Sequence, residues 1–267
     1  MGEVLMEEKT VLNRIDSCLS AKKNVLNVYF TAGYPNINDT LRIADALESA
    51  GADMLEIGIP FSDPVADGPT IQESSTVALA NGMTLEVLMD QLQALRSTVS
   101  IPVLLMGYFN PILQFGADRF CSACRAVGID GLIIPDLPMA EYAAHYKMLF
   151  QQNELHNVFL ISPNTPEERI MKIDEAGSGF IYMVSSSSIT GARKGLEEAQ
   201  IQYFERIQSM NLMNQRLIGF GISDHASFSS ACQYASGAII GSAFIKQLGK
   251  DPSNQAIEKF VKEIKGK

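Results

Sequence analysis

Short apolar runs, each followed by a turn and then by an amphipathic stretch, recur along the whole chain. They begin near residues 24, 53, 101, 130, 157, 179, 215 and 237. Parallel strands are covered by helices on both faces, so they appear in a sequence as nearly continuous apolar segments of this kind. Eight strand–helix units in 267 residues predict a closed (β/α)₈ barrel, an α/β fold of the TIM type, with an open doubly wound sheet as the alternative.

Both ends of the chain carry an additional helical pattern. Apolar residues three and four positions apart predict an extra N-terminal helix at about 9–22, which would pack against the bottom or the side of the barrel. The barrel is expected over about 24–250, and an amphipathic helix follows at about 252–265. No linker, low-complexity segment or further repeat divides the chain, so we expect residues 1–267 to form a single domain.

The charge and the hydropathy of the chain exclude several classes of function. A formal net charge of -9 argues against binding to nucleic acid or to an anionic membrane surface, because such proteins carry basic patches. No apolar run approaches the roughly 18 residues of a membrane-spanning helix. The acidic beginning MGEVLMEEKT lacks the pattern of a secretion signal. We therefore expect a cytoplasmic protein that acts on a small molecule.

The cysteines and histidines do not indicate a metal site. Cys121 and Cys124 have the C-x-x-C spacing, but their neighbours recur at helical spacing, so we expect a core-facing helix. The three histidines, His145, His156 and His225, are isolated in the sequence and are expected to be solvated or to cap helices. The sequence predicts no bound metal.

The segment LEIGIPFSDPVADGPTIQ, residues 55–72, begins as a buried strand and contains three carboxylates. Side chains alternate along a strand, so Glu56 shares with Met54 and Gly58 the face that the barrel encloses. An ionised carboxyl inside an apolar barrel is costly unless it is paired, hydrogen-bonded or protonated. Glu56 is either a structural carboxyl, with Tyr182 as a possible donor, or a general acid/base with a raised pKa. The apolar surroundings favour the second interpretation.

The other two carboxylates of this segment lie in the loop after the strand. In the motifs SDP and ADGP, Asp63 and Asp67 have the chemistry of ordinary turns, in which aspartate bonds the neighbouring backbone and Pro or Gly sets the dihedral angles. From the residues alone, either aspartate is more readily explained as structural than as catalytic.

Glycine-bearing motifs end the last two strands and indicate a phosphate site. The motif GFGIS spans 219–223 and GSAF spans 241–244, with Ser242 placed to begin a helix. Backbone amides in such loops bind phosphate without arginine, and (β/α)₈ barrels often place that site after strands seven and eight. The alternative is a structural role for each turn. The small polar segment at 185–195 is either a lid over the ligand or a flexible connection.

Taken together, these motifs resemble the tryptophan synthase alpha chain family over about residues 10–260. The resemblance implies a (β/α)₈ barrel that cleaves indole-3-glycerol phosphate to indole and glyceraldehyde 3-phosphate. It also implies a beta-chain partner, in an alpha2-beta2 tetramer, that alone holds pyridoxal phosphate, and no cofactor in this chain. The motifs that carry it are TAGYP, LEIGIPFSDPVADGPTIQ, MGYFNPIL, LIIPDLP, SPNT, SITGAR, GFGIS and GSAF.

The resemblance also assigns roles to individual residues. It implies that Glu56 is the acid/base, that Asp67 meets the indole N–H, and that Tyr182 lies beside the catalytic glutamate. The implied phosphate contacts are Gly191, Gly221, Gly241 and Ser242; Thr190 is the lid residue that engages the loop aspartate. The implied pocket residues are Tyr29, Met106, Tyr108, Ile133 and Leu160, and the implied partner face contains Asp63, Pro64 and Asn110.

The lid departs from the family pattern at Ser188, where many members have glycine, and at Ser186, where a basic residue is sometimes found. Serine restricts backbone dihedrals that glycine permits, so we expect activity to be retained and its stimulation by a partner to be unusual. Two alternatives remain: a free-standing lyase or a related phosphate-binding barrel, and a catalytically weak subunit that acts as an allosteric partner. A barrel that closes an indole ring would need a lysine at a strand end, and the strands supply none.

Overall fold

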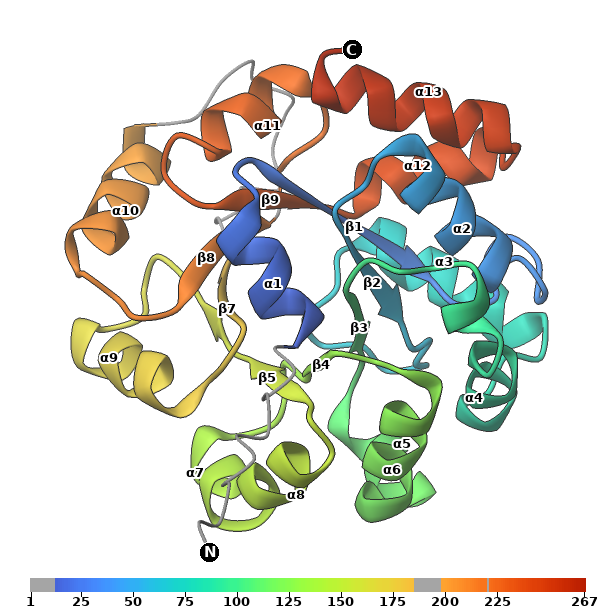
Figure 1. Ribbon diagram of the computed structural model, residues 1–267, viewed down its shortest axis with the longest axis horizontal. Helices are drawn as coiled ribbons and strands as arrows, with labels where there is room; N and C mark the ends of the chain where they lie inside the picture. Colours follow the sequence, from blue (N-terminus) through green and yellow to red (C-terminus); the bar gives the residue numbers. More distant parts are fainter. Residues whose placement is uncertain (1–12, 185–197, 220) are drawn as a thin grey trace, which may run out of the picture.

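A computed structural model describes residues 13–184, 198–219 and 221–267. Its strands form one sheet in the order β5-β4-β3-β2-β1-β9-β8-β7-β6, and each pair of neighbours is parallel (Figure 1). The strands are β1 (Val25–Thr31), β2 (Met54–Gly58), β3 (Val103–Met106), β4 (Gly131–Ile133), β5 (His156–Val158), β6 (Leu160–Ile161), β7 (Phe180–Val184), β8 (Gln215–Gly219) and β9 (Gly237–Ile240).

The two strands at the ends of this order are parts of one stretch of chain, and this closes the sheet. β5 pairs with β4, β6 pairs with β7, and only Phe159 separates β5 from β6. On the β7 side, Tyr182 N donates to Phe159 O at 2.9 Å, and Ser178 N donates to Asn157 O at 3.1 Å. One residue therefore divides the predicted fifth strand into β5 and β6, and these two segments together link β4 to β7 and close the barrel. The (β/α)₈ barrel is confirmed.

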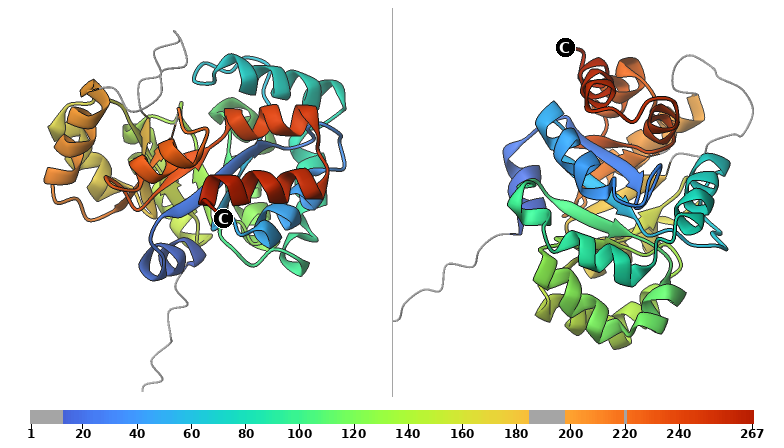
Figure 2. Two further views of the ribbon diagram at one scale, coloured as in Figure 1. Left: turned by 90° about the horizontal axis from the view of Figure 1, so that it is seen from above. Right: turned by 90° about the vertical axis from the view of Figure 1, so that its right-hand side faces the viewer.

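Helices surround the barrel on its outside and, in the case of α1, at one end (Figures 1 and 2). They are α1 (Arg14–Ala21), α2 (Thr40–Ala50), α3 (Pro69–Ala80), α4 (Leu85–Leu92), α5 (Phe109–Phe115), α6 (Ala117–Val127), α7 (Met139–Glu141), α8 (Lys147–Gln152), α9 (Glu167–Ala176), α10 (Glu198–Ser209), α11 (His225–Ala231), α12 (Ser242–Lys250) and α13 (Asn254–Lys265), with a 3₁₀ turn η1 (Leu95–Ser97) and a π-helical turn η2 (Tyr142–Tyr146). Among the described helices, none is long and apolar enough to cross a membrane.

The outer helices form where apolar residues repeat at helical spacing. α2 buries Ile43 and Leu47, and it ends at Gly51, whose φ of 101° is left-handed and favours glycine. α6 buries Cys121 and Cys124 against the main core, which confirms the core-facing interpretation of the C-x-x-C spacing. No cluster of three or more potential metal ligands occurs within the residues that the structure describes.

The inside of the barrel forms a second, separate core that α1 closes. Ile15, Cys18 and Leu19 of α1 are buried in it, so the extra helix lies across the bottom of the barrel rather than along its side. Figure 2 (left) shows α1 at one end of the strands. The inward-facing residues of this core include Val25, Met54, Leu104, Ile133, Val158, Phe180, Leu217 and Ile239.

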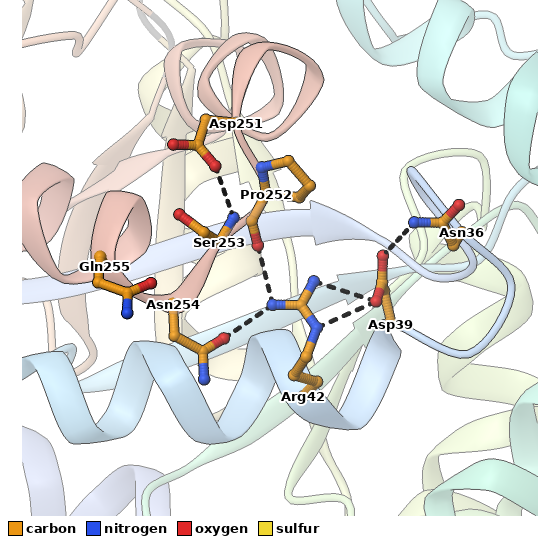
Figure 3. A pocket seen from close by; sticks show the side chains of 8 residues that line it. All are labelled: Asn36, Asp39, Arg42, Asp251, Pro252, Ser253, Asn254 and Gln255. Carbon is orange, nitrogen blue, oxygen red and sulfur yellow. Dashed lines mark hydrogen bonds and ion pairs between the residues drawn. The ribbon is translucent and has the colours of Figure 1, made fainter.

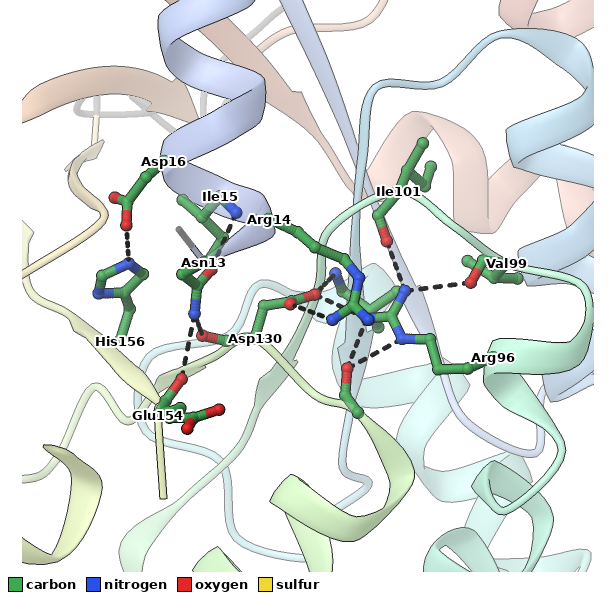
Figure 4. A network of polar contacts seen from close by, with 12 residues as sticks. Asn13, Arg14, Ile15, Asp16, Arg96, Val99, Ile101, Asp130, Glu154 and His156 are labelled. Carbon is green, nitrogen blue, oxygen red and sulfur yellow. Dashed lines mark hydrogen bonds and ion pairs between the residues drawn. The ribbon is translucent and has the colours of Figure 1, made fainter. Parts of the chain in front are cut away.

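A buried aspartate ties α1 to the bottom of the barrel (Figure 4). Asp130, just before β4, is 2% exposed. It accepts from Arg96 Nη2 at 2.6 Å, from Arg14 Nη1 at 2.9 Å and from Val103 N at 2.8 Å. The side chain of Asn13 donates to the backbone oxygen of Asp130 at 2.9 Å. Carboxylate, two guanidinium groups and a strand N–H thus form one network.

His156, isolated in the sequence, also belongs to this end of the molecule. It is the first residue of β5, and its Nε2 lies 2.9 Å from Asp16 Oδ2 of α1. His225 Nδ1 lies 2.9 Å from Ile264 O of α13. His145 lies in η2, 3.8 Å from the Glu141 carboxyl. In the described structure each histidine contacts a local polar group.

A second buried carboxylate joins both ends of the described chain. Asp53, at the start of β2, accepts from Lys22 Nζ at 2.8 Å and from Lys265 Nζ of α13 at 2.7 Å. Leu26 N also donates to Asp53 Oδ2 at 3.0 Å. Burial raises the pKa of Asp53, but the hydrogen bonds from the two lysines and from Leu26 N, together with the charge of Lys265, leave the pKa below its ordinary value.

A surface recess of about 590 Å³ lies where the loop between α12 and α13 meets α2 (Figure 3). The guanidinium of Arg42 is hydrogen-bonded within this recess. It donates to Pro252 O and to Asn254 Oδ1, each at 2.8 Å, and to Asp39 Oδ1 at 3.0 Å. Because this guanidinium is already paired and no predicted site residue lines the recess, we interpret it as a structural joint.

Candidate active site

The catalytic candidates lie on the inner face of the barrel and in the loop that follows β2. Glu56 on β2 is fully buried, and Tyr29 on β1 is its partner in the strand register. Tyr182 on β7 belongs to the core inside the barrel. Glu56 and Asp67 both act electrostatically on Tyr29 and Tyr182, so groups from β1, β2, β7 and the loop after β2 form one candidate site.

The carboxyl of Glu56 is set up for proton transfer. Its Oε1 accepts from Asn27 Nδ2 at 2.5 Å, whereas its Oε2 has no hydrogen-bond partner among the described residues. Burial raises the pKa of Glu56 to about 8, and the hydrogen bond from Asn27 opposes this only in part. A carboxyl whose pKa lies near neutral pH can both give and take a proton during a reaction.

The donor to Glu56 differs from the one that the sequence indicated. The sequence indicates Tyr182 as a possible donor, whereas in the described chain Asn27 of β1 donates to the Glu56 carboxyl. Asn27 lies on the same inward face as Tyr29, two residues earlier, and it is a polar residue in an otherwise apolar run. Its polarity at an enclosed position was the signal that could have identified it.

Two tyrosines pack closely against glycines beside Glu56. A Cβ on Gly58 would lie 2.1 Å from Tyr29 Oη, and a Cβ on Gly219 would lie 2.4 Å from Tyr182 Oη. These two glycines therefore make room for the rings. Burial, followed by the charge of Glu56, raises the pKa of Tyr182 well above its ordinary value, so its phenol stays protonated.

Asp67 lies in the loop between β2 and α3 and is held by two neighbours. Tyr108 Oη donates to Asp67 Oδ2 at 3.0 Å, and the same oxygen of Tyr108 accepts from Ala66 N at 3.0 Å. Gln72 Nε2 donates to Asp67 O at 2.8 Å. Burial raises the pKa of Asp67, and the Tyr108 hydrogen bond lowers it in part. A simple turn residue needs no such hydrogen bond from Tyr108, which lies between β3 and α5.

Asp63 is arranged differently from Asp67. It is exposed, and its side chain accepts from the adjacent Ser62 hydroxyl at 2.5 Å. The two aspartates of the loop thus have separate surroundings: Asp67 lies against the pocket, and Asp63 faces outward. The structure distinguishes the surroundings of Asp63 from those of Asp67, whereas the turn motifs in the sequence did not.

Known proteins match this chain over nearly its whole length. The sequence model described as "Tryptophan synthase alpha chain" matches residues 15–266. The chain belongs to the tryptophan synthase alpha chain family. A Flavobacterium psychrophilum tryptophan synthase alpha chain is 56% identical over 253 residues, covering 95% of this chain and 100% of the relative. The family performs the lyase step of tryptophan synthase, the cleavage of indole-3-glycerol phosphate.

Solved structures agree with the family assignment. A tryptophan synthase alpha chain from Legionella pneumophila is 31% identical with a TM-score of 0.84, covering 96% of this chain and 97% of that one. A chain of a tryptophan synthase complex from Pyrococcus furiosus is 35% identical with a TM-score of 0.83, covering 92% and 99%. The fold of this chain is therefore that of tryptophan synthase alpha chains.

The remaining pocket candidates lie at strand ends around Glu56. Ile133 at the end of β4 is fully buried in the barrel interior, and Met106 of β3 and Leu160 of β6 are half-buried and pack against the same interior core. Their apolar side chains suit the indole ring that alpha chains of this family accept.

Part of the predicted phosphate site lies in the described structure. Gly221 has a φ of 78°, and Gly241 is the N-cap of α12, which begins at Ser242. Among the described residues no side chain caps α12, and amides at an uncapped helix N-terminus are suited to bind an anion. The lid candidates Ser188, Thr190 and Gly191 lie outside the described residues.

Proposed function

We propose that this alpha chain cleaves indole-3-glycerol phosphate with Glu56 as the proton-transfer group and Asp67 as the carboxylate that stabilises charge on the indole nitrogen. The observation that supports this assignment is that two carboxyls, one on β2 and one in the loop that follows it, both act on Tyr29. One is enclosed, with a pKa raised to about 8, and the other lies in the loop against Tyr108. Only burial and neutral donors perturb these carboxyls within the described chain, so neither is committed to a lysine or arginine.

The chemistry assigns the two carboxyls different roles. Cleavage between indole C3 and the glycerol chain is a retro-aldol reaction. Protonated Glu56 gives its proton to C3, and the positive charge that develops on the ring nitrogen is stabilised by Asp67, which accepts the N–H. The Glu56 carboxylate then removes the proton of the side-chain hydroxyl. The carbon–carbon bond breaks, its electrons restore the indole ring, the aldehyde forms, and Glu56 is protonated again.

The substrate phosphate is assigned to the end of the barrel that Gly221, Gly241 and Ser242 form. The open amides at the beginning of α12 provide donors and the positive end of a helix dipole. Gly191 is proposed to add a further backbone contact from the lid, and Thr190 to engage Asp67. This local arrangement allows a chain of net charge -9 to bind an anion.

The proposed partner is a tryptophan synthase beta chain, in an alpha2-beta2 assembly in the cytoplasm. Asp63, in the loop after β2, and Asn110, in the first turn of α5, are exposed, and Pro64 is partly exposed. In the same two segments Val65 is 83% exposed and Leu113 is 47% exposed, which supplies apolar area of the kind that a protein interface uses. Pyridoxal phosphate belongs to the beta chain in this proposal, and the alpha chain requires no cofactor because its carboxyls perform both proton transfers.

The proposal is tested by comparing two substitutions in one loop. Asp67→Asn removes the carboxylate charge that faces the pocket, and we expect kcat for indole release to fall by about 10²- to 10³-fold. Asp63→Asn is the matched control: it should leave the lyase activity of the isolated chain unchanged and weaken only stimulation by a beta chain. The measurement is indole release from indole-3-glycerol phosphate, with and without a beta chain.

The possible results separate the alternatives. No indole release by the wild-type chain under either condition would reject the proposed reaction and favour an allosteric subunit. Full activity with no response to a beta chain would favour a free-standing lyase. Equal losses in the two aspartate variants would show that the division of roles between Asp63 and Asp67 is wrong.

A further inference from the structure

The contact between Asn27 and Glu56 is unusual for the interior of an apolar barrel. Asn27 is fully buried, and its Nδ2 donates to Glu56 Oε1 at 2.5 Å. Asn27 Oδ1 and Glu56 Oε2 are both buried without a hydrogen-bond partner in the described structure. Burying a polar group without a full set of hydrogen bonds is destabilising, so a purely structural role would favour an apolar residue at this position. The amide therefore calls for a functional explanation.

The strand register shows from which side Asn27 approaches the carboxyl. Glu56 pairs with Tyr29, and Asn27 precedes Tyr29 by two residues on the same inward face of β1. Asn27 thus lies closer than Tyr29 to the end of the barrel that α1 closes. Ligands of such barrels bind at the opposite end, where the strands terminate. Asn27 is placed behind the carboxyl, away from the substrate.

We propose that Asn27 is a positioning residue for proton transfer: its amide fixes Glu56 Oε1 from behind and confines the transferable proton to Oε2, on the substrate side. This inference rests on the proposed function of Glu56. An N–H donor can bond Oε1 whether the group is a carboxylate or a carboxylic acid with its proton on Oε2. A proton on Oε1 would instead point at the N–H of Asn27. The same contact therefore holds the carboxyl in both states that the reaction requires.

Among the described residues, the groups around Glu56 do not supply an alternative donor with a charge. The titratable side chains there that interact electrostatically with Glu56 are Tyr29 from β1 and Tyr182 from β7. Both phenols have pKa values raised by burial, so they remain neutral. Since the hydrogen bond from Asn27 lowers the pKa of Glu56, its removal should shift the titration of this carboxyl to higher pH.

The test replaces the amide by a side chain of similar size without hydrogen-bonding groups. In Asn27→Leu we expect kcat for indole release to fall about 10- to 100-fold, with KM changed less than about threefold. The alkaline limb of the kcat–pH profile, where Glu56 loses the proton that it gives to C3, should move to higher pH. Titration of ¹³C-labelled glutamate carboxyls by NMR, with Glu56→Gln to assign the signal, should show the same upward movement without substrate.

Two further variants make the result specific. Val25→Ala removes packing from the same inward face of β1 and should lower the melting temperature without moving the Glu56 titration. Asn27→Thr keeps a hydroxyl donor and should recover part of kcat, and it replaces Asn27→Leu if the latter does not fold. An unchanged kcat and titration in a folded Asn27 variant, or an equal shift in Val25→Ala, would overturn the inference. Activity in Glu56→Gln would instead reject the proposed function.

Discussion

Replacing Glu56 by glutamine is expected to reduce kcat for indole release by at least about 10²- to 10⁴-fold, the contribution that a positioned proton-transfer group typically makes. The side chain is fully enclosed, so a change of its shape would disturb the surrounding packing. Glutamine has nearly the same volume, and its Oε1 can still accept the hydrogen bond from Asn27. What it loses is the transferable proton. Because binding contacts are preserved, KM should change little, and the loss should appear in kcat.

The same substitution should raise stability at alkaline pH. The pKa of Glu56 is about 8 in the folded chain and near its ordinary value of 4.5 when unfolded, so the folded state binds the proton more tightly. The stabilisation is fully present below the unfolded pKa and is lost as pH rises toward 8, by up to about 1.4 kcal/mol for each pH unit. Glu56→Gln should remove this slope. Thermal unfolding at pH 5 and pH 9 measures it.

An active Glu56→Gln protein with wild-type kcat would show that another group transfers the proton. A variant that is inactive but equally pH-dependent in stability would show that the carboxyl does not have the raised pKa. The comparison therefore examines the chemistry and the electrostatics separately. Stability gained by removing a catalytic group is the usual sign of a strained functional site.

Asp130→Ala is expected to destabilise the fold by roughly 3–5 kcal/mol, because it leaves charged partners of a buried ion pair uncompensated. The Asp130 carboxyl is 3% exposed and contacts Arg96, whose side chain is 20% exposed, as well as Arg14. Removal also leaves Val103 N without its acceptor. Urea unfolding measures the change, and the slope of the unfolding free energy with urea should stay the same if the native fold is retained.

An exposed ion pair near the same end of the barrel provides the control. Arg125 and Glu154 lie 2.8 Å apart, but their side chains are 51% and 74% exposed. Glu154→Ala should therefore change the unfolding free energy by only about 0–1 kcal/mol. Similar losses in Asp130→Ala and Glu154→Ala would contradict the view that burial makes the Asp130 network important.

The sequence predicts the barrel because its signal is local and repeated. Each strand is an apolar run, and alternation along β2 alone places Glu56 inside the barrel. The break between β5 and β6 at Phe159 was not predictable, because it depends on pairing with strands on both sides. The helix at 14–21 was expected near these residues, but only contacts with inward-facing side chains show that it closes the bottom.

The contacts that define the site were harder to predict because they join residues distant in the sequence. Asn27 and Glu56 are 29 positions apart, and Tyr108 and Asp67 are 41 apart. Such pairs follow from the register of neighbouring strands and from the path of a loop. Local periodicity in the sequence predicts neither the register nor the loop path. Turn chemistry explained both Asp63 and Asp67 equally well until Tyr108 distinguished them.

The two lysines on Asp53 have a consequence for synthesis of the chain on the ribosome. Lys22 emerges before Asp53, but Lys265 is 212 residues away and follows it. The pairing of β1 with β9 also waits for distant sequence. Nascent chains that lack α13 therefore hold the Asp53 carboxylate with only one of its two lysine partners, and until β9 emerges the growing sheet has unpaired edges on both sides. Closure of the ring is a late event, and until then chaperones have exposed strands to protect.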